Sequence, residues 1–410
     1  MNVYEPIQRA GAPAIVRFTG QDATFRRLVT RGALLELLTF GFYRFWLATD
    51  IRRHLWSNTE IDGDALEYTG RGKELLLGFL VAMAVLAPLF LLYFLAGLES
   101  ERYKAFASLP LYGFLYLFGQ FAVYRARRYR LTRTIWRGIR FWMTGSGWAY
   151  ALRALLWGLL LIPTLGFAYP WRTAALERYK LGHTFYGNLP GRFASTGWAL
   201  FKRIWWVWLL GLLPIIMVFG GLVAAAIAAK MGSARNSPLM SGAGMAMLLG
   251  FIPLVALPFL HAVRVATEWK WWAEGIRFGD AAVGCVLPST ALIGVYWSLI
   301  GMGVLVVLLF SAPAAGLAGS LVAGIGKAGL AALASHPPIW IFAAYGVWYL
   351  GLLLTLGVVG RIYTLQRVWR RVAGACVLLN PVATANVMAA GEAASALGEG
   401  LADGLDFAGF

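Results

Sequence analysis

Long apolar runs alternate with short basic segments along the chain. Six runs contain no Asp, Glu, Lys or Arg, and each can cross about 30 Å of hydrocarbon as a helix rising about 1.5 Å per residue. They are residues 75–97, 106–124, 207–229, 245–263, 286–310 and 339–360. A helix satisfies its own backbone hydrogen bonds inside lipid. The pattern therefore predicts six transmembrane helices.

Two shorter apolar runs, 32–47 and 151–169, have basic clusters on both sides. If the first run crossed the membrane, one of its basic clusters would lie outside, against the positive-inside rule. Glu36 in its middle would add a cost of about 3 kcal/mol. We expect both runs to form re-entrant or interfacial helical hairpins on the cytoplasmic side. The alternative is a chain with eight spans.

The composition agrees with a membrane protein. Hydrophobic residues make up 60% of the 410 residues and charged residues 13%, with a mean hydropathy of +0.66. Soluble domains are about 25% charged, so the composition excludes a cytosolic enzyme, a disordered chain and a secreted disulfide scaffold. The two cysteines, Cys285 and Cys376, are 91 residues apart without a metal-binding spacing, which favours free thiols.

The net charge of +17 is distributed very unevenly. With six spans and both termini inside, 31 of the 36 Lys and Arg residues fall on one side of the membrane. Such a bias marks the cytoplasmic face and removes the need for a nucleic-acid partner. We expect a multi-pass protein of the bacterial inner membrane with both termini in the cytoplasm.

A sequence pattern recurs at an offset of 125 residues. Residues 39–46 (TFGFYRFW) are followed by residues 164–171 (TLGFAYPW), which places Gly166 at the position of Gly41. Asp62-Gly63, between the apolar-polar runs 59–61 and 64–68, predicts a β-hairpin with a type I′ turn. Each copy precedes two long spans, so the copies are parallel repeats.

The chain accordingly divides into a first repeat (1–124), a second repeat (125–263), a degenerate third unit (264–380) and an acidic Ala/Gly-rich cytoplasmic tail (381–410). The predicted fold class is an all-α polytopic membrane protein with small β-hairpins, built from parallel internal repeats.

Several of these motifs resemble the YjgN-like family of uncharacterised bacterial inner-membrane proteins, a domain-of-unknown-function family. The motifs are residues 18–20 (FTG), 38–43 (LTFGFY) with Trp46, 58–63 (NTEIDG) with 66–68 (LEY), and 398–403 (GEGLAD) with Asp406. They extend over nearly the whole chain. Arg44-Phe45 departs from the expected small residue followed by Pro, which Pro170 retains in the second copy. The resemblance implies a location and an architecture, but no activity or catalytic residues.

Residue patterns typical of catalysis are missing from the sequence. The four histidines are isolated from other ligand types, and neither a phosphate-binding glycine loop nor a Gly-x-Ser-x-Gly motif is present. Asp62 and Asp64 are close together, but a solvated hairpin turn accounts for them. We therefore predict no enzyme, no cofactor and no metal site.

Arginine and tryptophan residues near the predicted cytoplasmic edge are the best candidates for contact with lipid head groups. Tryptophan favours the membrane interface, and each basic residue contributes about 1 kcal/mol against anionic lipid. The proposed contacts are Arg52, Arg53, Arg125, Arg127, Arg128, Arg178, Trp46 and Trp171.

Two functions remain open from the sequence. The first is a passive or lipid-handling transport pathway, since the six runs contain no acidic residue for ion coupling. The second is a membrane scaffold that binds anionic lipids of the phospholipid bilayer, or a cytosolic protein partner, through its basic inner face. Association into a homo-oligomer is compatible with both.

Overall fold

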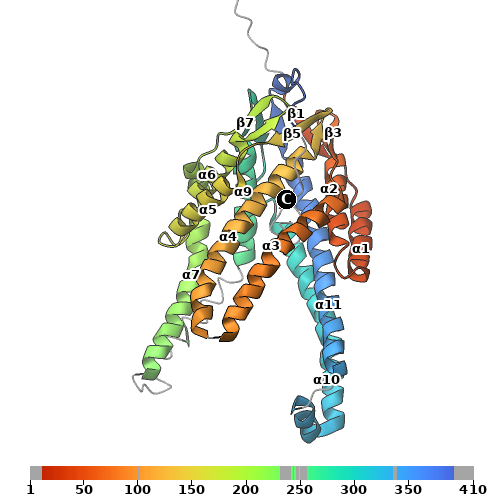
Figure 1. The fold of residues 1–410 in the computed structure, drawn as a ribbon, viewed down its shortest axis with the longest axis vertical. Helices are drawn as coiled ribbons and strands as arrows, with labels where there is room; N and C mark the ends of the chain where they lie inside the picture. The colour runs from red at the N-terminus through yellow and green to blue at the C-terminus, as the bar shows by residue number, and fades with distance from the viewer. Residues whose placement is uncertain are drawn as a thin grey trace, which may run out of the picture.

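Figure 1 shows a small β-structure at one end of the molecule, from which long helices extend. The computed structural model describes residues 12–99, 101–230, 242, 244, 245, 249, 256–335 and 339–391. Its helices are α1 (Asp22–Leu38), α2 (Arg44–Ser57), α3 (Gly72–Glu99), α4 (Glu101–Thr132), α5 (Gly147–Leu161), α6 (Tyr169–Gly182), α7 (Gly197–Lys230), α9 (Leu257–Gly275), α10 (Ile293–Ser335), α11 (Ile339–Gly360) and α12 (Gln366–Gly374). A π-helical turn, η1 (Arg361–Leu365), joins α11 to α12, and a 3-10 turn, η2 (Pro381–Thr384), follows the last strand.

Ten short strands in the described part of the chain form a closed antiparallel barrel. They are β1 (Ala14–Phe18), β2 (Thr59–Ile61), β3 (Asp64–Tyr68), β4 (Thr134–Trp136), β5 (Ile139–Met143), β6 (Thr184–Tyr186), β7 (Leu189–Phe193), β8 (Ile276–Phe278), β9 (Ala281–Cys285) and β10 (Cys376–Leu379). Each strand pairs with its neighbours in sequence, and β10 pairs with β1 to complete the ring. The chain is mostly helical, as expected, but the closure of its hairpins into one ring was not anticipated.

The same order of elements recurs around the barrel. A five-residue strand leads into a pair of helices that returns to a short strand, and a two-residue turn then begins the next unit. In the described residues, α1–α2 and α5–α6 are short helical hairpins, whereas α3–α4, α7–α9 and α10–α12 contain longer helices. The 125-residue offset carries Ala14 onto Ile139 and Thr59 onto Thr184, the first residues of corresponding strands.

Side chains fill the inside of the barrel. The rings of Trp136 on β4 and Tyr186 on β6 lie 5.4 Å apart, and those of Phe141 on β5 and Phe278 on β8 lie 5.9 Å apart. These strands are not neighbours in the ring, so the rings meet across the interior. Trp136 and Tyr186 are almost fully buried. The barrel is therefore a packed core, as in other small barrels, rather than an open channel.

The predicted hairpin over residues 59–68 is confirmed by β2 and β3. Asp62 and Gly63 have φ angles of 57° and 84°, and positive φ at both central residues defines a type I′ turn. The turn beside it is tied to the first one, because Arg137 forms ion pairs with Asp62 (2.8 Å) and Asp64 (2.5 Å). Asp62 and Asp64 thus have a structural role between neighbouring hairpins.

Four helical segments among the described residues are long and apolar enough to cross a membrane. They are Gly72–Leu95, Gly197–Lys230, Ile293–Pro313 and Ile339–Gly374. They overlap the predicted spans 75–97, 207–229, 286–310 and 339–360. The predicted span 106–124 lies within α4, which is not one of the four, and residues 246–248 and 250–255 of the predicted span 245–263 lie outside the described residues. The number six thus stays a prediction.

One predicted boundary is wrong. The span 286–310 does not begin at Val286, because the backbone N–H of Val286 donates to Ala375 O (2.8 Å) and continues the pairing of β9 with β10. Pro288 follows and offers no N–H group. Helix α10 consequently begins at Ile293.

The two ambiguous runs, 32–47 and 151–169, each contain a turn between two helices. Thr39 Oγ1 donates to Leu35 O (2.7 Å) and accepts from the backbone N–H of Tyr43 (2.9 Å). Thr164 makes the corresponding bonds to Leu160 O (2.7 Å) and from Ala168 (3.4 Å). Gly41 and Gly166 have φ angles of 88° and 84°, a conformation that glycine adopts without strain. The repeated glycines therefore mark equivalent turns.

Candidate functional site

A buried charged cluster lies where three helix pairs meet below the barrel. Glu177 on α6 forms ion pairs with Lys180 on the same helix and with Arg127 on α4, at 3.4 Å from Arg127. Trp272 on α9 donates its indole N–H to the same carboxylate (3.0 Å). The Arg127 guanidinium also lies 6.0 Å from the centre of the Trp272 ring. One carboxylate thus holds together α4, α6 and α9.

The charges in this cluster depend on one another. Burial alone would raise the pKa of Glu177, but Lys180 and Arg127 outweigh burial and hold the pKa below its usual value. Burial lowers the pKa of Lys180, and Glu177 partly offsets that effect. Every charged group in the cluster has an oppositely charged partner. We call this cluster of Glu177, Lys180, Arg127 and Trp272 the clasp, because it joins α4, α6 and α9.

Other charged side chains join helices within a unit and between neighbouring units. Glu74, in the first turn of α3, accepts from the Tyr129 hydroxyl (2.5 Å) and pairs with Arg133 (2.9 Å) on α4. Glu36 on α1, which would have been costly in a membrane span, pairs with Arg361 in η1 at 2.8 Å. The acidic residues near the apolar helices therefore have basic partners.

A collar of exposed basic and tryptophan residues lies next to the barrel on four of its five units. We define the collar as Arg26, Arg27, Arg31, Arg71, Lys73, Arg153, Lys202, Arg203, Trp148, Trp198, Trp205 and Trp206, all exposed. These residues lie near the starts of α1, α3, α5 and α7, the first helices of four successive units. At about 1.5 Å per residue, they lie within about 15 Å of the barrel.

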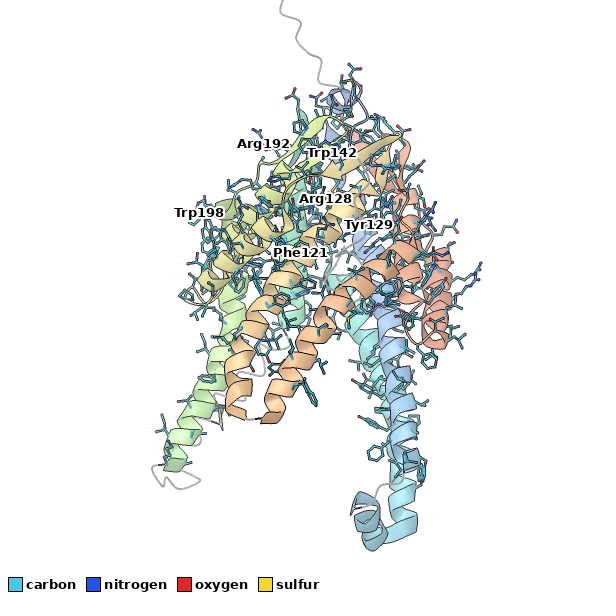
Figure 2. All side chains as sticks on the ribbon, viewed as in Figure 1. Phe121, Arg128, Tyr129, Trp142, Arg192 and Trp198 are labelled. Atoms are coloured by element: carbon cyan, nitrogen blue, oxygen red, sulfur yellow. The ribbon has the colours of Figure 1, made fainter. Side chains whose placement is uncertain are left out.

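Two cations of the collar lie against aromatic rings. The Lys202 ammonium lies 5.5 Å from the centre of the Trp198 ring, and Trp198 is 52% exposed. Arg153 lies 4.4 Å from the centre of the Tyr179 ring. Figure 2 shows Trp198 at the outside of the molecule, below Arg192 on the barrel wall. Such side chains combine an apolar body with a positive charge, as an interface with lipid head groups requires.

The structure divides the eight predicted lipid contacts into two groups. Arg53 and Arg178 are exposed, and their contact with lipid stays a prediction. Arg52 is buried, with its guanidinium 3.5 Å from the Tyr68 hydroxyl, and Arg127 belongs to the buried cluster. Arg125 and Arg128 are partly buried on α4.

Trp46 and Trp171 are also partly buried, and each packs against the start of the next unit. A Cβ atom added to Gly72 would lie 2.9 Å from Trp46 Cα, and one added to Gly197 would lie 2.7 Å from Trp171 Cα. Both contacts are too close for any larger residue. These tryptophans therefore fix the joints between successive units at equivalent positions 125 residues apart.

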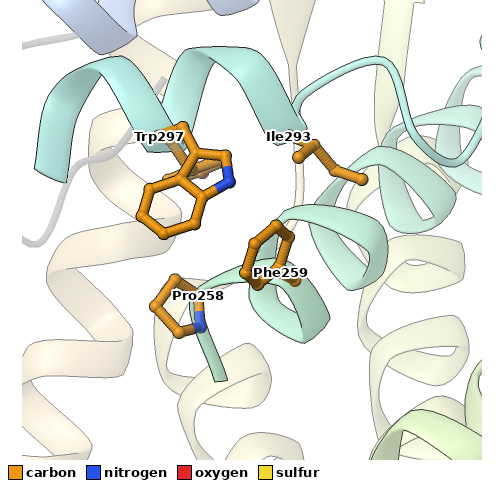
Figure 3. A pocket seen from close by; sticks show the side chains of 5 residues that line it. Pro258, Phe259, Ile293 and Trp297 are labelled. Atoms are coloured by element: carbon orange, nitrogen blue, oxygen red, sulfur yellow. The ribbon is translucent and has the colours of Figure 1, made fainter. Parts of the chain in front are cut away.

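The described residues lack a cluster of metal-binding side chains and contain an apolar hollow between α9 and α10. Among them, no group of three or more His, Cys, Asp or Glu side chains could hold a metal ion. A hollow between α9 and α10 is lined by Pro258, Phe259, Ile293, Tyr296 and Trp297, with the Phe259 and Trp297 rings edge to face at 4.8 Å (Figure 3). Its lining is aromatic and aliphatic, without a charged group.

Neither Glu177 of the clasp nor any of the twelve collar residues is among the eight contacts predicted from the sequence. A signal for Glu177 was available, because it is a lone acidic residue between Arg172, Arg178 and Lys180. Predicting the collar requires the positions at which the helices begin. Those positions depend on strands only three to five residues long.

The chain matches a known protein family over most of its length. Residues 13–404 match the family model described as "Bacterial protein of unknown function (DUF898)". The chain belongs to this family. The match confirms the resemblance to the YjgN-like group, which is the same family. The four apolar helices indicate a membrane protein of this bacterial family. No curated protein and no solved structure matches the chain.

Proposed function

We propose that this DUF898 protein is an inner-membrane scaffold whose collar binds the head groups of anionic phospholipids. The observation that carries the proposal is the collar itself, where exposed Lys, Arg and Trp side chains of four units lie at the junction between the barrel and the apolar helices. Basic residues at a membrane surface attract anionic lipid. The bias of 31 basic residues to this side supports a cytoplasmic position for the barrel.

The geometry favours the scaffold over a transport pathway. Several polar side chains of the predicted spans are taken up by hydrogen bonds within the protein, as Tyr116 donates to Ala154 O (3.0 Å) and Tyr124 donates to Thr144 O (2.5 Å). Thr355 donates to Gly351 O one turn earlier, and Ser298 donates to Val295 O. The barrel interior is packed, and only 0–22% of each apolar span window is buried. The spans therefore present their surfaces to lipid, or to further copies of the chain, instead of enclosing a polar route.

The short hairpins support a position at the inner surface. Helix α5 has 15 residues, or about 22 Å, which is too short to cross about 30 Å of hydrocarbon. The hairpin tips are apolar and exposed, with Phe40 95% and Leu165 72% accessible. We infer that α1–α2 and α5–α6 insert their tips into the inner leaflet and return. Their equivalent turns also support the proposed parallel repeat.

Lipid binding can be tested with charge-neutral variants of the collar. Replacing Arg26 and Arg27 by glutamine should weaken binding of phosphatidylglycerol by about 2 kcal/mol, roughly 30-fold, at about 1 kcal/mol for each cation. The measurement is native mass spectrometry of detergent-solubilised protein titrated with phosphatidylglycerol or phosphatidylcholine.

The matched control replaces Arg17 and Arg192, two exposed arginines on the barrel strands β1 and β7. This control should bind phosphatidylglycerol like the wild type. Equal retention of both lipids by the wild type, or equal losses in the two double variants, would contradict the proposal.

Orientation can be tested with single cysteines in a chain whose Cys285 and Cys376 are replaced by serine. Ala65 on β3 and Ala229 near the end of α7 are both exposed, at opposite ends of the long helices. A cysteine at Ala65 should react with an impermeant maleimide only after the membrane is opened. A cysteine at Ala229 should react in intact cells. The reverse pattern would place the barrel outside.

A further inference from the structure

Cys285 and Cys376, although 91 positions apart in sequence, are directly opposite each other in the barrel. Cys285 ends β9, Cys376 begins β10, and the two are register partners. The backbone bond from Val286 N–H to Ala375 O (2.8 Å) lies one residue beyond them, so they form a non-hydrogen-bonded pair. The Cα atoms of such pairs are about 4.5 Å apart, within the range of about 4.4–6.8 Å that a disulfide spans.

In each of the other four units of the barrel, a pair of residues lies at the position that Cys285 and Cys376 occupy in the fifth unit. These pairs are Phe18 opposite Thr59, Tyr68 opposite Thr134, Met143 opposite Thr184 and Phe193 opposite Ile276. The same backbone hydrogen bond lies next to each of these pairs, for example from Thr19 N–H to Asn58 O (2.9 Å) and from Thr144 N–H to His183 O (2.9 Å). In these four units a large side chain meets a threonine or isoleucine. Only in the fifth unit of the described barrel do two thiols meet.

The surroundings of the two thiols change their pKa values in opposite directions. Cys285 is 6% exposed and packs with Leu287, Leu292 and Val295, whereas Cys376 is half-buried. The Cys376 thiol donates to the Cys285 sulfur, which lowers the pKa of Cys285 to about 7 and raises that of Cys376. A thiolate is the reactive form of cysteine, and the hydrogen bond between the two thiols favours the loss of one proton from the pair.

We propose that Cys285 and Cys376 form a reversible disulfide that responds to hydrogen peroxide at the seam between β9 and β10. The Cys285 thiolate attacks one peroxide oxygen, the O–O bond breaks, and the departing hydroxide takes a proton to become water. Cys285 is then a sulfenic acid. Cys376 attacks the Cys285 sulfur, its proton passes to the hydroxyl, and a second water leaves. Two thiols and one peroxide thus give one disulfide and two waters, and a cytosolic dithiol reductant reverses the reaction.

Peroxide suits this site because it is small and uncharged. It can reach a thiolate that is almost fully buried, whereas a bulky disulfide oxidant must first meet the half-buried Cys376. The bond would join the two strands whose connection contains α10, α11 and α12. Oxidation would therefore keep β9 and β10 joined whatever the arrangement of those helices.

The experiment uses the purified full-length protein in mild detergent. It is treated with graded hydrogen peroxide, alkylated with N-ethylmaleimide, and analysed by intact mass and by peptide mapping. The reduced protein should take up two maleimides. The oxidised protein should take up none, lose two hydrogen atoms, and yield a Cys285–Cys376 linked peptide that dithiothreitol separates.

Two variants separate the roles of the thiols. Cys376→Ser should stop at a Cys285 sulfenic acid that dimedone traps, and Cys285→Ser should oxidise at least tenfold more slowly. Wild-type protein that keeps two alkylatable thiols at peroxide levels sufficient to oxidise glutathione would overturn the proposal. So would a wild type that accumulates Cys285 sulfinic acid without the linked peptide. The wild-type mapping decides the question even if a variant fails to fold.

Discussion

Replacement of Glu177 by alanine is expected to lower the free energy of unfolding by about 3–5 kcal/mol, because it leaves two buried cations without their counter-ion. The Glu177 side chain is 10% exposed, against 20% for Arg127 and 13% for Lys180. Solvent therefore cannot replace the carboxylate at low cost. The loss should appear in denaturant titrations in mild detergent, followed by the helical circular dichroism signal.

Glu67→Ala is the matched control, since Glu67 is exposed on β3 of the barrel. Surface substitutions of this kind usually change stability by less than about 0.5 kcal/mol. If both variants lose the same stability, the clasp contributes nothing beyond a surface carboxylate.

The clasp also predicts how stability depends on pH. The pKa of Glu177 in the folded protein lies below its ordinary value of 4.5. Its contribution is therefore fully present above pH 4.5 and is lost as the pH falls through the lower folded pKa. Acid titrations of wild type and Glu177→Gln should converge at low pH. A constant difference between them would exclude this linkage.

Replacement of Trp271 by alanine is expected to cost about 3–5 kcal/mol, the usual range for a large aromatic residue removed from a packed core. Trp271 is 2% exposed on α9, lies edge-on to Phe193 at 5.0 Å, and donates its indole N–H to Thr196 O (3.0 Å). It thus connects α9 to the segment between β7 and α7. Its removal leaves both a cavity and an unsatisfied carbonyl.

Trp205→Ala provides the comparison, because Trp205 on α7 is 45% exposed. We expect the Trp271 variant to unfold at a much lower denaturant concentration than the Trp205 variant, with a similar slope. Similar midpoints for the two variants would show that the barrel base does not depend on Trp271.

Local features of the fold were readable from the sequence. The Asp62-Gly63 pair indicated a hairpin, since a type I′ turn needs two residues that tolerate positive φ. The offset of 125 residues located the equivalent turns at Gly41 and Gly166. Apolar length alone located most of α3, α7 and α11 and the first 18 of the 43 residues of α10.

The closed barrel could not be predicted from these signals. Its strands have three to five residues, too few to show a clear alternation of apolar and polar positions. The pairing of Ala14 with Leu378 joins segments with no local relation. The burial of Arg127 likewise depends on Glu177, a residue of another unit, so a basic run alone suggested contact with lipid.

The pairing of β1 with β10 constrains the order of events during biosynthesis. A ribosome makes β1 near the beginning of the chain and β10 only after residue 379 has been added. Until then, β1 and the most recently made strand each present an unpaired edge, which can join other chains. The apolar helices between the strands must therefore enter the membrane while the ring is still open. The ring therefore closes late in synthesis. A chain interrupted before β10 keeps the unpaired edge of β1, whereas a chain that includes β10 can cover it.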